Sequence, residues 1–155
     1  MKNKSPLFLI FLVVFIDLLG FGIVIPILPY YASTYGATAT HLGLLMMSYS
    51  AMQFLFSPLW GKLSDHIGRR PVLLISILGN AIALIVLASA SSLLWLFVGR
   101  IFSGICGANI STAMAYIADI TPPEKRTKGM GIIGAGFGLG FIFGPAIGGV
   151  LSKYG

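Results

Sequence analysis

The sequence predicts an all-α transmembrane protein with five helices, and two observations carry this prediction. Hydrophobic residues make up 57 % of the 155-residue chain and charged residues only 9 %, a composition too apolar for a soluble domain of this length. The apolar residues also stand in continuous runs, and about 20 such residues form a helix that crosses a bilayer. A transmembrane β-barrel would instead need alternating polar and apolar residues.

The first three apolar runs predict helices at about 7–28, 42–61 and 72–90. Residues 30–41 are more polar and predict an external loop between the first two helices. Pro71 directly precedes the third run, and a proline suits the first turn of a helix because it has no N–H to leave unpaired. The first half of the chain therefore predicts three spans with short links.

The last two apolar runs predict helices at about 93–118 and 129–151. The polar link between them contains Thr121 and Glu124, which have the spacing of a capping box at a helix start. The sequence contains no linker or second soluble domain, so the five helices belong to one membrane domain.

The basic residues indicate how these helices cross the membrane. The net charge is +6, but eight of the ten basic residues fall on one side of the predicted spans. By the positive-inside rule that side is cytoplasmic, which predicts a multi-pass plasma-membrane protein with a cytoplasmic N-terminus. The charge thus reflects lipid-bilayer topology and does not indicate a nucleic-acid partner. The eight residues are Lys2, Lys4, Lys62, Arg69, Arg70, Lys125, Arg126 and Lys128.

Two charged residues lie inside predicted spans. Asp17 is about ten residues into the first helix, or ~15 Å deep, and Arg100 is ~10 Å below the external end of the fourth. Their depths agree within about one turn, so the two side chains can pair. Charges inside a membrane are costly and usually functional. The pair is either a structural ion pair or a group that responds to protons.

Glycines in the fifth helix recur every four residues and therefore share one helix face. Such a face permits close approach of another helix. The Gly-Pro-Ala-Ile-Gly-Gly run near the end of this helix is expected to kink or loosen it. The residues of this motif are Gly136, Gly140, Gly144, Pro145, Gly148 and Gly149.

The link between the second and third helices is rich in charge and glycine. It holds Gly61, Lys62, Asp65, Gly68, Arg69 and Arg70 within a few residues. Asp119 ends the fourth helix on the same side of the membrane, so a cluster of Asp65, Arg69 and Asp119 is expected there. The alternative is a solvated charge pair, which contributes little to stability.

Three polar residues, Gln53, Asn80 and Asn109, lie inside predicted spans and either line a substrate cavity or bond neighbouring helices. His41 and His66 lie in predicted loops with no partner at metal-ligand spacing, so no metal site is expected. No nucleophile–base arrangement or phosphate loop is visible either. The sequence therefore indicates that the protein is not an enzyme.

Four motifs together resemble a known family. The link sequence Gly-Lys-Leu-Ser-Asp-His-Ile-Gly-Arg-Arg at 61–70 resembles the loop between helices 2 and 3 of the major facilitator superfamily. The segments at 17–29, 96–107 and 140–149 resemble the helix-1, helix-4 and helix-5 signatures of its drug:proton antiporters. The resemblance covers the whole chain and is greatest for the tetracycline-exporter-like branch.

The resemblance implies the N-terminal helical bundle of such a transporter, present as a partial domain over 1–155 without its sixth helix. The implied activity is proton-coupled efflux of drugs or amphipathic small molecules by alternating access, with protons as the coupling ion and no cofactor. The missing C-terminal half and the small-molecule substrate are the implied partners, and the bacterial inner membrane is the implied location. The runner-up functions are a metabolite or sugar facilitator or symporter and a non-transporting membrane scaffold.

The resemblance also assigns roles to residues. It implies that Asp17 and Arg100 couple protons, that the cluster around Asp65 latches the cytoplasmic face, and that the glycines of the fifth helix pack against the C-terminal half. The tetracycline exporters carry a further acid in helix 3, where this chain has Ala83. The implied substrate class is therefore broader than tetracycline.

Overall fold

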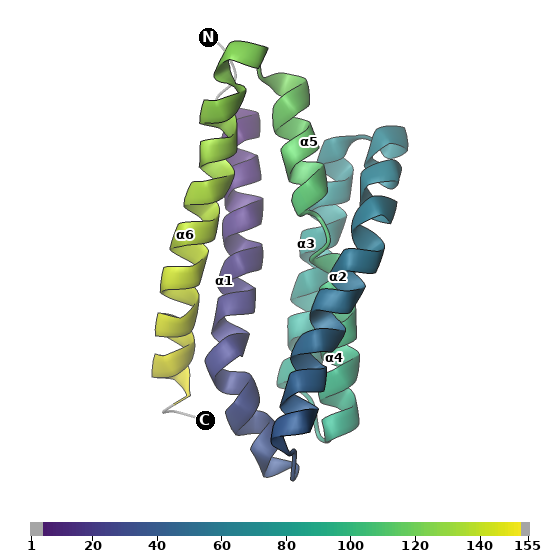
Figure 1. Cartoon of the computed structure of the whole chain (residues 1–155), viewed down its shortest axis with the longest axis vertical. Helices are drawn as coiled ribbons and strands as arrows, with labels where there is room; N and C mark the ends of the chain where they lie inside the picture. The colour runs from purple at the N-terminus through teal and green to yellow at the C-terminus, as the bar shows by residue number, and fades with distance from the viewer. Residues whose placement is uncertain (1–4, 153–155) are drawn as a thin grey trace.

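The structure, a computed structural model, describes residues 5–152 as a bundle of roughly aligned helices (Figure 1). Lys2, Lys4 and Lys153 lie outside the described residues. Five segments of the described chain are long and apolar enough to span a membrane, which confirms the predicted all-α class. The elements are α1 (Ser5–Thr34), α2 (Ala39–Ile67), α3 (Arg69–Ala88), α4 (Leu93–Cys106), α5 (Ile110–Ile120), a 3-10 turn (Pro123–Lys125) and α6 (Arg126–Leu151).

The first two helices extend beyond their predicted ends. α1 continues to Thr34, and α2 begins at Ala39 because Thr38 and His41 form a capping box. The His41 backbone N–H donates to Thr38 Oγ1, and the Thr38 N–H donates to His41 Nδ1 at 3.1 Å. The predicted loop over 30–41 is therefore wrong in its bounds, and the connection between α1 and α2 covers only residues 35–38. Hydropathy predicts the part of a helix that crosses the lipid, whereas capping residues set where the helix begins.

The fourth predicted helix is interrupted. Its span consists of α4 and α5, separated by turn residues at 107–109, so the continuous helix predicted at 93–118 is wrong. The capping box predicted at Thr121 is also wrong, since the Thr121 hydroxyl has no hydrogen-bond partner. Two prolines follow Thr121, and a residue before proline favours an extended backbone. The ψ angle is 128° at Thr121 and 150° at Pro122. α6 therefore begins only at Arg126.

Two apolar cores fill the bundle, one toward each end. The core at the end that carries the α2–α3 turn joins α1, α3, α5 and α6, and the other core joins α1 to α2, α3 and α4. Asp17, Ser76, Asn80, Ser103 and Asn109 are buried polar residues in the middle of the spans, between the two cores. These five buried polar groups thus form a central layer.

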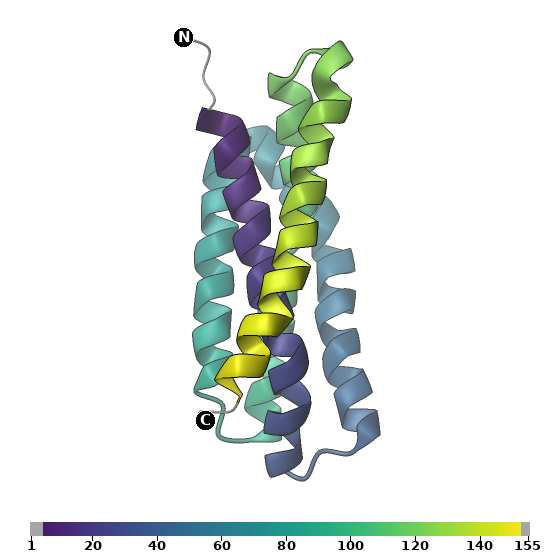
Figure 2. The ribbon, with the colours of Figure 1, turned by 90° about the vertical axis from the view of Figure 1, so that its left-hand side faces the viewer.

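Four glycines of α6, spaced four residues apart, face α1, and the two helices run side by side (Figures 1 and 2). An ideal Cβ at Gly140 would lie 2.6 Å from Leu18 Cβ, and one at Gly144 would lie 2.7 Å from Gly22 Cα. Gly136 and Gly148 are likewise buried against α1. The expectation that this face packs against a second half of the protein is therefore wrong, because α1 already occupies it. α6 remains helical through Pro145 to Leu151, and Gly149 has open space beside it.

Candidate functional site

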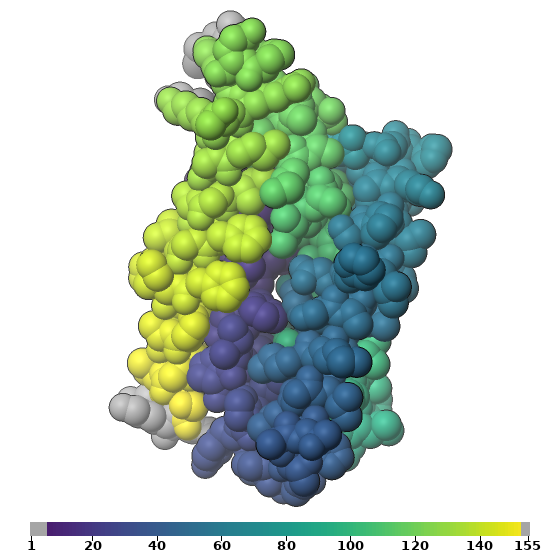
Figure 3. All heavy atoms as spheres, in the orientation of Figure 1, coloured from purple at the N-terminus to yellow at the C-terminus, as the bar shows by residue number. Residues whose placement is uncertain are grey.

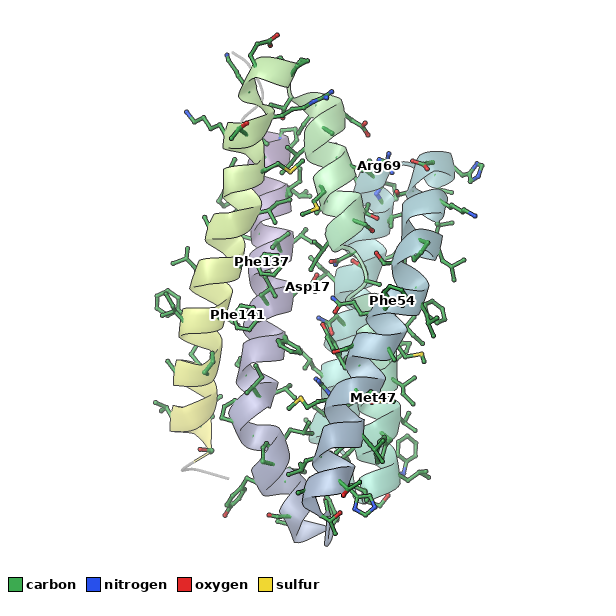
Figure 4. All side chains as sticks on the ribbon, in the orientation of Figure 1. Asp17, Met47, Phe54, Arg69, Phe137 and Phe141 are labelled. Carbon is green, nitrogen blue, oxygen red and sulfur yellow. The ribbon has the colours of Figure 1, made fainter. Side chains whose placement is uncertain are left out.

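The central polar layer is built around Asp17, at mid-height in the bundle (Figure 4). Its side chain is nearly enclosed, with the residue only 8 % exposed. Asn80 of α3 donates its Nδ2–H to Asp17 Oδ1 at 2.9 Å, and the Asn109 amide donates to Asp17 Oδ2. Asn109 Nδ2 also donates to Ser76 Oγ at 2.7 Å. Each carboxylate oxygen is therefore bound by a neutral amide.

Arg100 does not form the direct pair with Asp17 that the depths allowed. Among the described residues no salt bridge involves either side chain. The guanidinium carbon lies 4.5 Å from the centre of the Tyr49 ring and 5.5 Å from that of Phe21, an arrangement that stabilises a buried cation. The depth of a residue in the membrane does not determine the direction in which its side chain points. Asp17 points toward α3 and the start of α5, whereas Arg100 points toward α2.

Arg100 nevertheless lies close to one of the partners of Asp17. Asn80, which binds Asp17, and Arg100 line the same small gap together with Tyr49 and Ser103. Arg100 Nε also donates to the Leu45 carbonyl at 3.5 Å. A buried cation thus lies at a small gap that is also lined by Asn80, one of the two amides that bind the buried carboxylate.

The break in the fourth span lies beside this layer and is held by α2. An interrupted helix frees backbone carbonyls, which need partners inside a membrane. Gln53 donates its Nε2–H to the Gly107 carbonyl at 3.1 Å, and Trp60 donates its Nε1–H to the Ile105 carbonyl at 2.6 Å. The sequence left open whether Gln53, Asn80 and Asn109 line a cavity or bond neighbouring helices. All three form hydrogen bonds to other helices or to the break.

Glycine permits the close crossing of α4 and α2 at this break. An ideal Cβ at Gly107 would lie 2.9 Å from the Tyr49 hydroxyl, and one at Gly104 would lie 2.9 Å from Met52 Cβ. The crossing leaves two fully buried oxygens without partners, Asn109 Oδ1 and Thr112 Oγ1. Such groups cost about 1–3 kcal/mol each.

The predicted cluster at the α2–α3 end of the bundle is present. Arg69 NH1 lies 2.7 Å from Asp65 Oδ1, and Arg69 Nε lies 3.0 Å from Asp119 Oδ2. The same NH1 donates to Ser64 Oγ, a buried hydroxyl that sequence reasoning missed. Arg69 thus ties together α2, α3 and α5, and it lies near one end of the bundle (Figure 4).

The segment around this cluster is mostly helical rather than a loop. Gly61 and Asp65 lie in the last turns of α2, and Gly68 alone separates α2 from α3. Gly68 has φ 97°, a conformation that favours glycine. Arg70 is an exposed residue in the first turn of α3, and Pro71 follows it there as predicted.

Comparison with known proteins identifies the family. The sequence profile described as Major Facilitator Superfamily matches residues 10–155. The chain belongs to the major facilitator superfamily. Tetracycline resistance protein class H of Pasteurella multocida is 40 % identical over 152 residues, which cover 96 % of this chain and 38 % of that protein. The class C protein of Escherichia coli is 44 % identical over 154 residues, covering 97 % of this chain and 39 % of that protein.

A mammalian relative is more distant. Major facilitator superfamily domain-containing protein 10 of Mus musculus is 32 % identical over 180 residues, covering 97 % of this chain and 40 % of that protein. The chain thus spans about two fifths of the length of these curated relatives. Together with the five spans, the match makes this superfamily member a multi-pass membrane protein.

One face of this superfamily member is open and apolar. In the space-filling view, α1 is visible between α6 and α2, which flank it (Figure 3). Phe54 and Met47 on α2 are 79 % and 63 % exposed, and Phe141 on α6 is also exposed. Figure 4 shows these side chains and Phe137 on the two helices that flank Asp17. This apolar surface lies on either side of the helix that carries Asp17.

Sequence reasoning also missed Ser76 and Trp60, which take part in the site only through contacts across the bundle. Ser76 is a small residue in an apolar run, and Trp60 sits at a predicted helix end, where tryptophan is common. Neither position carries a signal in the sequence that points to Asn109 or to the break.

Proposed function

We propose that the protein exports drugs or other amphipathic small molecules in exchange for protons by alternating access, with Asp17 as the group that takes up the proton. One observation carries the proposal: a buried carboxylate at mid-span is bound by two neutral amides and by no base. An amide can serve both protonation states, because turning it brings its oxygen to accept from a protonated carboxyl, whereas a salt bridge would have to break.

Arg100 acts beside it in this proposal. Its cation lies at the small gap that Asn80 also lines, so the field it creates at Asp17 changes if α4 moves relative to α1. The side chain is buried and held by two aromatic rings, which keeps the charge inside the span. Proton uptake by Asp17 and a shift of α4 are therefore coupled electrostatically.

The Arg69 cluster is proposed as a latch on the cytoplasmic face. The Arg69 guanidinium joins three helices through Asp65, Asp119 and Ser64, so opening that end of the bundle must separate at least one of these contacts. The positive-inside rule favours a cytoplasmic N-terminus, and the bacterial tetracycline resistance relatives favour the bacterial inner membrane. Gly61, Gly68 and Arg70 flank the latch, and Gly68 provides its turn.

The apolar face between α2 and α6 supports an amphipathic substrate and contact with a C-terminal half of the transporter. Exposed Phe54, Met47 and Phe141 offer aromatic and thioether surface, which suits such compounds better than sugars. The tetracycline resistance relatives favour drug export, and the buried Ala83 in α3 favours a substrate class broader than tetracycline. A sugar or metabolite facilitator is the weaker candidate for the same reasons.

Transport in inverted membrane vesicles tests the proposal with the full-length protein. An imposed proton gradient should drive uptake of an amphipathic cationic dye, and Asp17→Asn should abolish this uptake while leaving the amount of protein in the membrane unchanged. Glu124→Gln is the matched control and should keep proton-driven uptake, because Glu124 is an exposed carboxylate in the 3-10 turn, outside both the central layer and the Arg69 cluster. Proton-driven uptake by Asp17→Asn at the wild-type rate would refute the role of Asp17.

A further inference from the structure

The break between α4 and α5 touches both Asp17 and α2. On one side Asn109, the last residue of the break, donates to the Asp17 carboxylate. On the other side Gln53 and Trp60 of α2 donate to carbonyls of Gly107 and Ile105. A movement of this short segment would therefore change contacts at both places.

Asn109 has an incomplete set of hydrogen bonds. The residue is fully buried, its Nδ2 donates to both Asp17 and Ser76, and its Oδ1 has no partner. Nearly all buried polar atoms are bonded, so an exception calls for an explanation. The observed arrangement suits an ionised carboxylate, which can only accept hydrogen bonds.

Protonation of Asp17 would change which atom of the Asn109 amide can form a hydrogen bond with the carboxyl group. A protonated carboxyl carries an O–H donor, and the Nδ2–H of Asn109 cannot accept from it. Turning the amide of Asn109 by half a rotation places Oδ1 toward Asp17, where it accepts that hydrogen bond. Thr112 Oγ1, on the same face of α5, is a second unpartnered oxygen that can then accept from Nδ2.

We propose that Asn109 senses the protonation state of Asp17 and that the break transmits the change to α2 through the carbonyls held by Gln53 and Trp60. This inference rests on the proposed proton uptake by Asp17. Asn109 is a positioning residue in this scheme, and the break is its movable element. α2 also carries the exposed Phe54 and Met47, so a change at the break reaches the apolar face (Figure 4).

Other groups near Asp17 belong in the test. The further titratable side chains close to it are Cys106 of α4 and Tyr49 of α2, and the Arg100 cation lies at the gap that Asn80 also lines. The charged residues of α3, α5 and α6 lie at the α2–α3 end of the bundle. His66 lies near Trp60 in α2, so only the part of a pH response that depends on Asp17 is informative.

The Trp60 indole is a natural reporter, because its N–H is bonded to the break at 2.6 Å. The full-length protein is labelled with 5-fluorotryptophan in nanodiscs, and the Trp60 fluorine resonance is assigned by its loss in Trp60→Phe. This resonance should shift with pH in the wild type, and the shift should be lost in Asp17→Asn. Infrared absorption of the protonated carboxyl shows in parallel whether Asp17 still titrates.

Asn109→Leu and Asn80→Leu form the matched comparison. Both remove an amide that donates to Asp17, but only Asn109 belongs to the break. Asn109→Leu should lose the Asp17-dependent shift while the carboxyl still titrates, and Asn80→Leu should keep the shift. An unchanged Asp17-dependent shift in Asn109→Leu would overturn the proposal.

The wild-type comparison decides the matter even if Asn109→Leu does not fold. A Trp60 resonance with the same pH response in the wild type and in Asp17→Asn would overturn the inference. The vesicle assay keeps the two proposals apart: export that needs Asp17 without a Trp60 response refutes only the sensing role. A Trp60 response that needs Asp17 without proton-driven export refutes only the proposed function.

Discussion

Replacing Gly140 by alanine should separate α6 from α1. An ideal Cβ at this position would lie 2.6 Å from Leu18 Cβ and 3.1 Å from the Leu19 backbone nitrogen. Carbon atoms in contact prefer a separation of about 3.5–4.0 Å, so α6 must move outward by roughly 1 Å. Rotation of a side chain cannot relieve the contact, because two of the nearest atoms belong to the α1 backbone. Overpacking of this kind costs about 1–3 kcal/mol.

The same helix provides its own control. Gly131 and Gly138 have no atom within 4 Å of an ideal Cβ, so alanine there meets no obstacle. An alanine in place of glycine within a helix stabilises by about 0.5–1 kcal/mol. This gain is common to all three variants and cancels in the comparison, so we expect Gly140→Ala to be less stable than either control by about 1–3 kcal/mol in free energy of unfolding.

Titration with SDS in mixed micelles measures this difference for the full-length protein, with helix content as the signal. Equal unfolding midpoints for Gly140→Ala, Gly131→Ala and Gly138→Ala would refute the packing of the glycine face against α1. A loss of export without a loss of stability in Gly140→Ala would point instead to a contact outside this bundle.

Three further outcomes follow from the structure. A cysteine at Thr38 should react with an impermeant reagent added outside intact cells and one at His66 should not; the reverse pattern would contradict the proposed topology. Arg69→Ala should increase the rate at which a reagent added on the cytoplasmic side labels cysteines introduced in the central layer. The free energy of unfolding should change by at most about 1 kcal/mol, because the carboxylate partners of Arg69 are exposed. Unchanged labelling would argue against a latch. Gly68→Ala should destabilise the protein by about 1–3 kcal/mol in thermal unfolding, since φ is 97° there, and a neutral result would mean that the turn adopts another conformation.

The helices themselves could be predicted from the sequence because the bilayer imposes a simple requirement. A span needs a continuous apolar run, and five such runs were visible without any tertiary information. Pro71 also indicated correctly where α3 would begin. The ends of α1 and α2 were misjudged because a helix can continue beyond the lipid, where capping by Thr38 rather than hydropathy sets the boundary.

The Arg69 cluster could be predicted because its members are close in sequence or at the same membrane level. Asp65 and Arg69 are four residues apart, and Asp119 ends a span on the same side. The cost of burying a charge singled out Asp17 as a structural or proton-responsive group, but it did not indicate the partners of Asp17. Asn80 and Asn109 were recognised only as polar residues inside spans, with two interpretations left open.

The sequence by itself determined the class of protein, the number of spans and the depth of each buried charge, since composition and distance along the chain decide these. Only the tertiary structure decided which way each side chain points around its helix. That rotation separates Arg100 from Asp17, turns the glycines of α6 toward α1, and brings Asn109 to the carboxylate. The rotation of each helix depends on how neighbouring helices pack, and the sequence of one helix does not specify that packing.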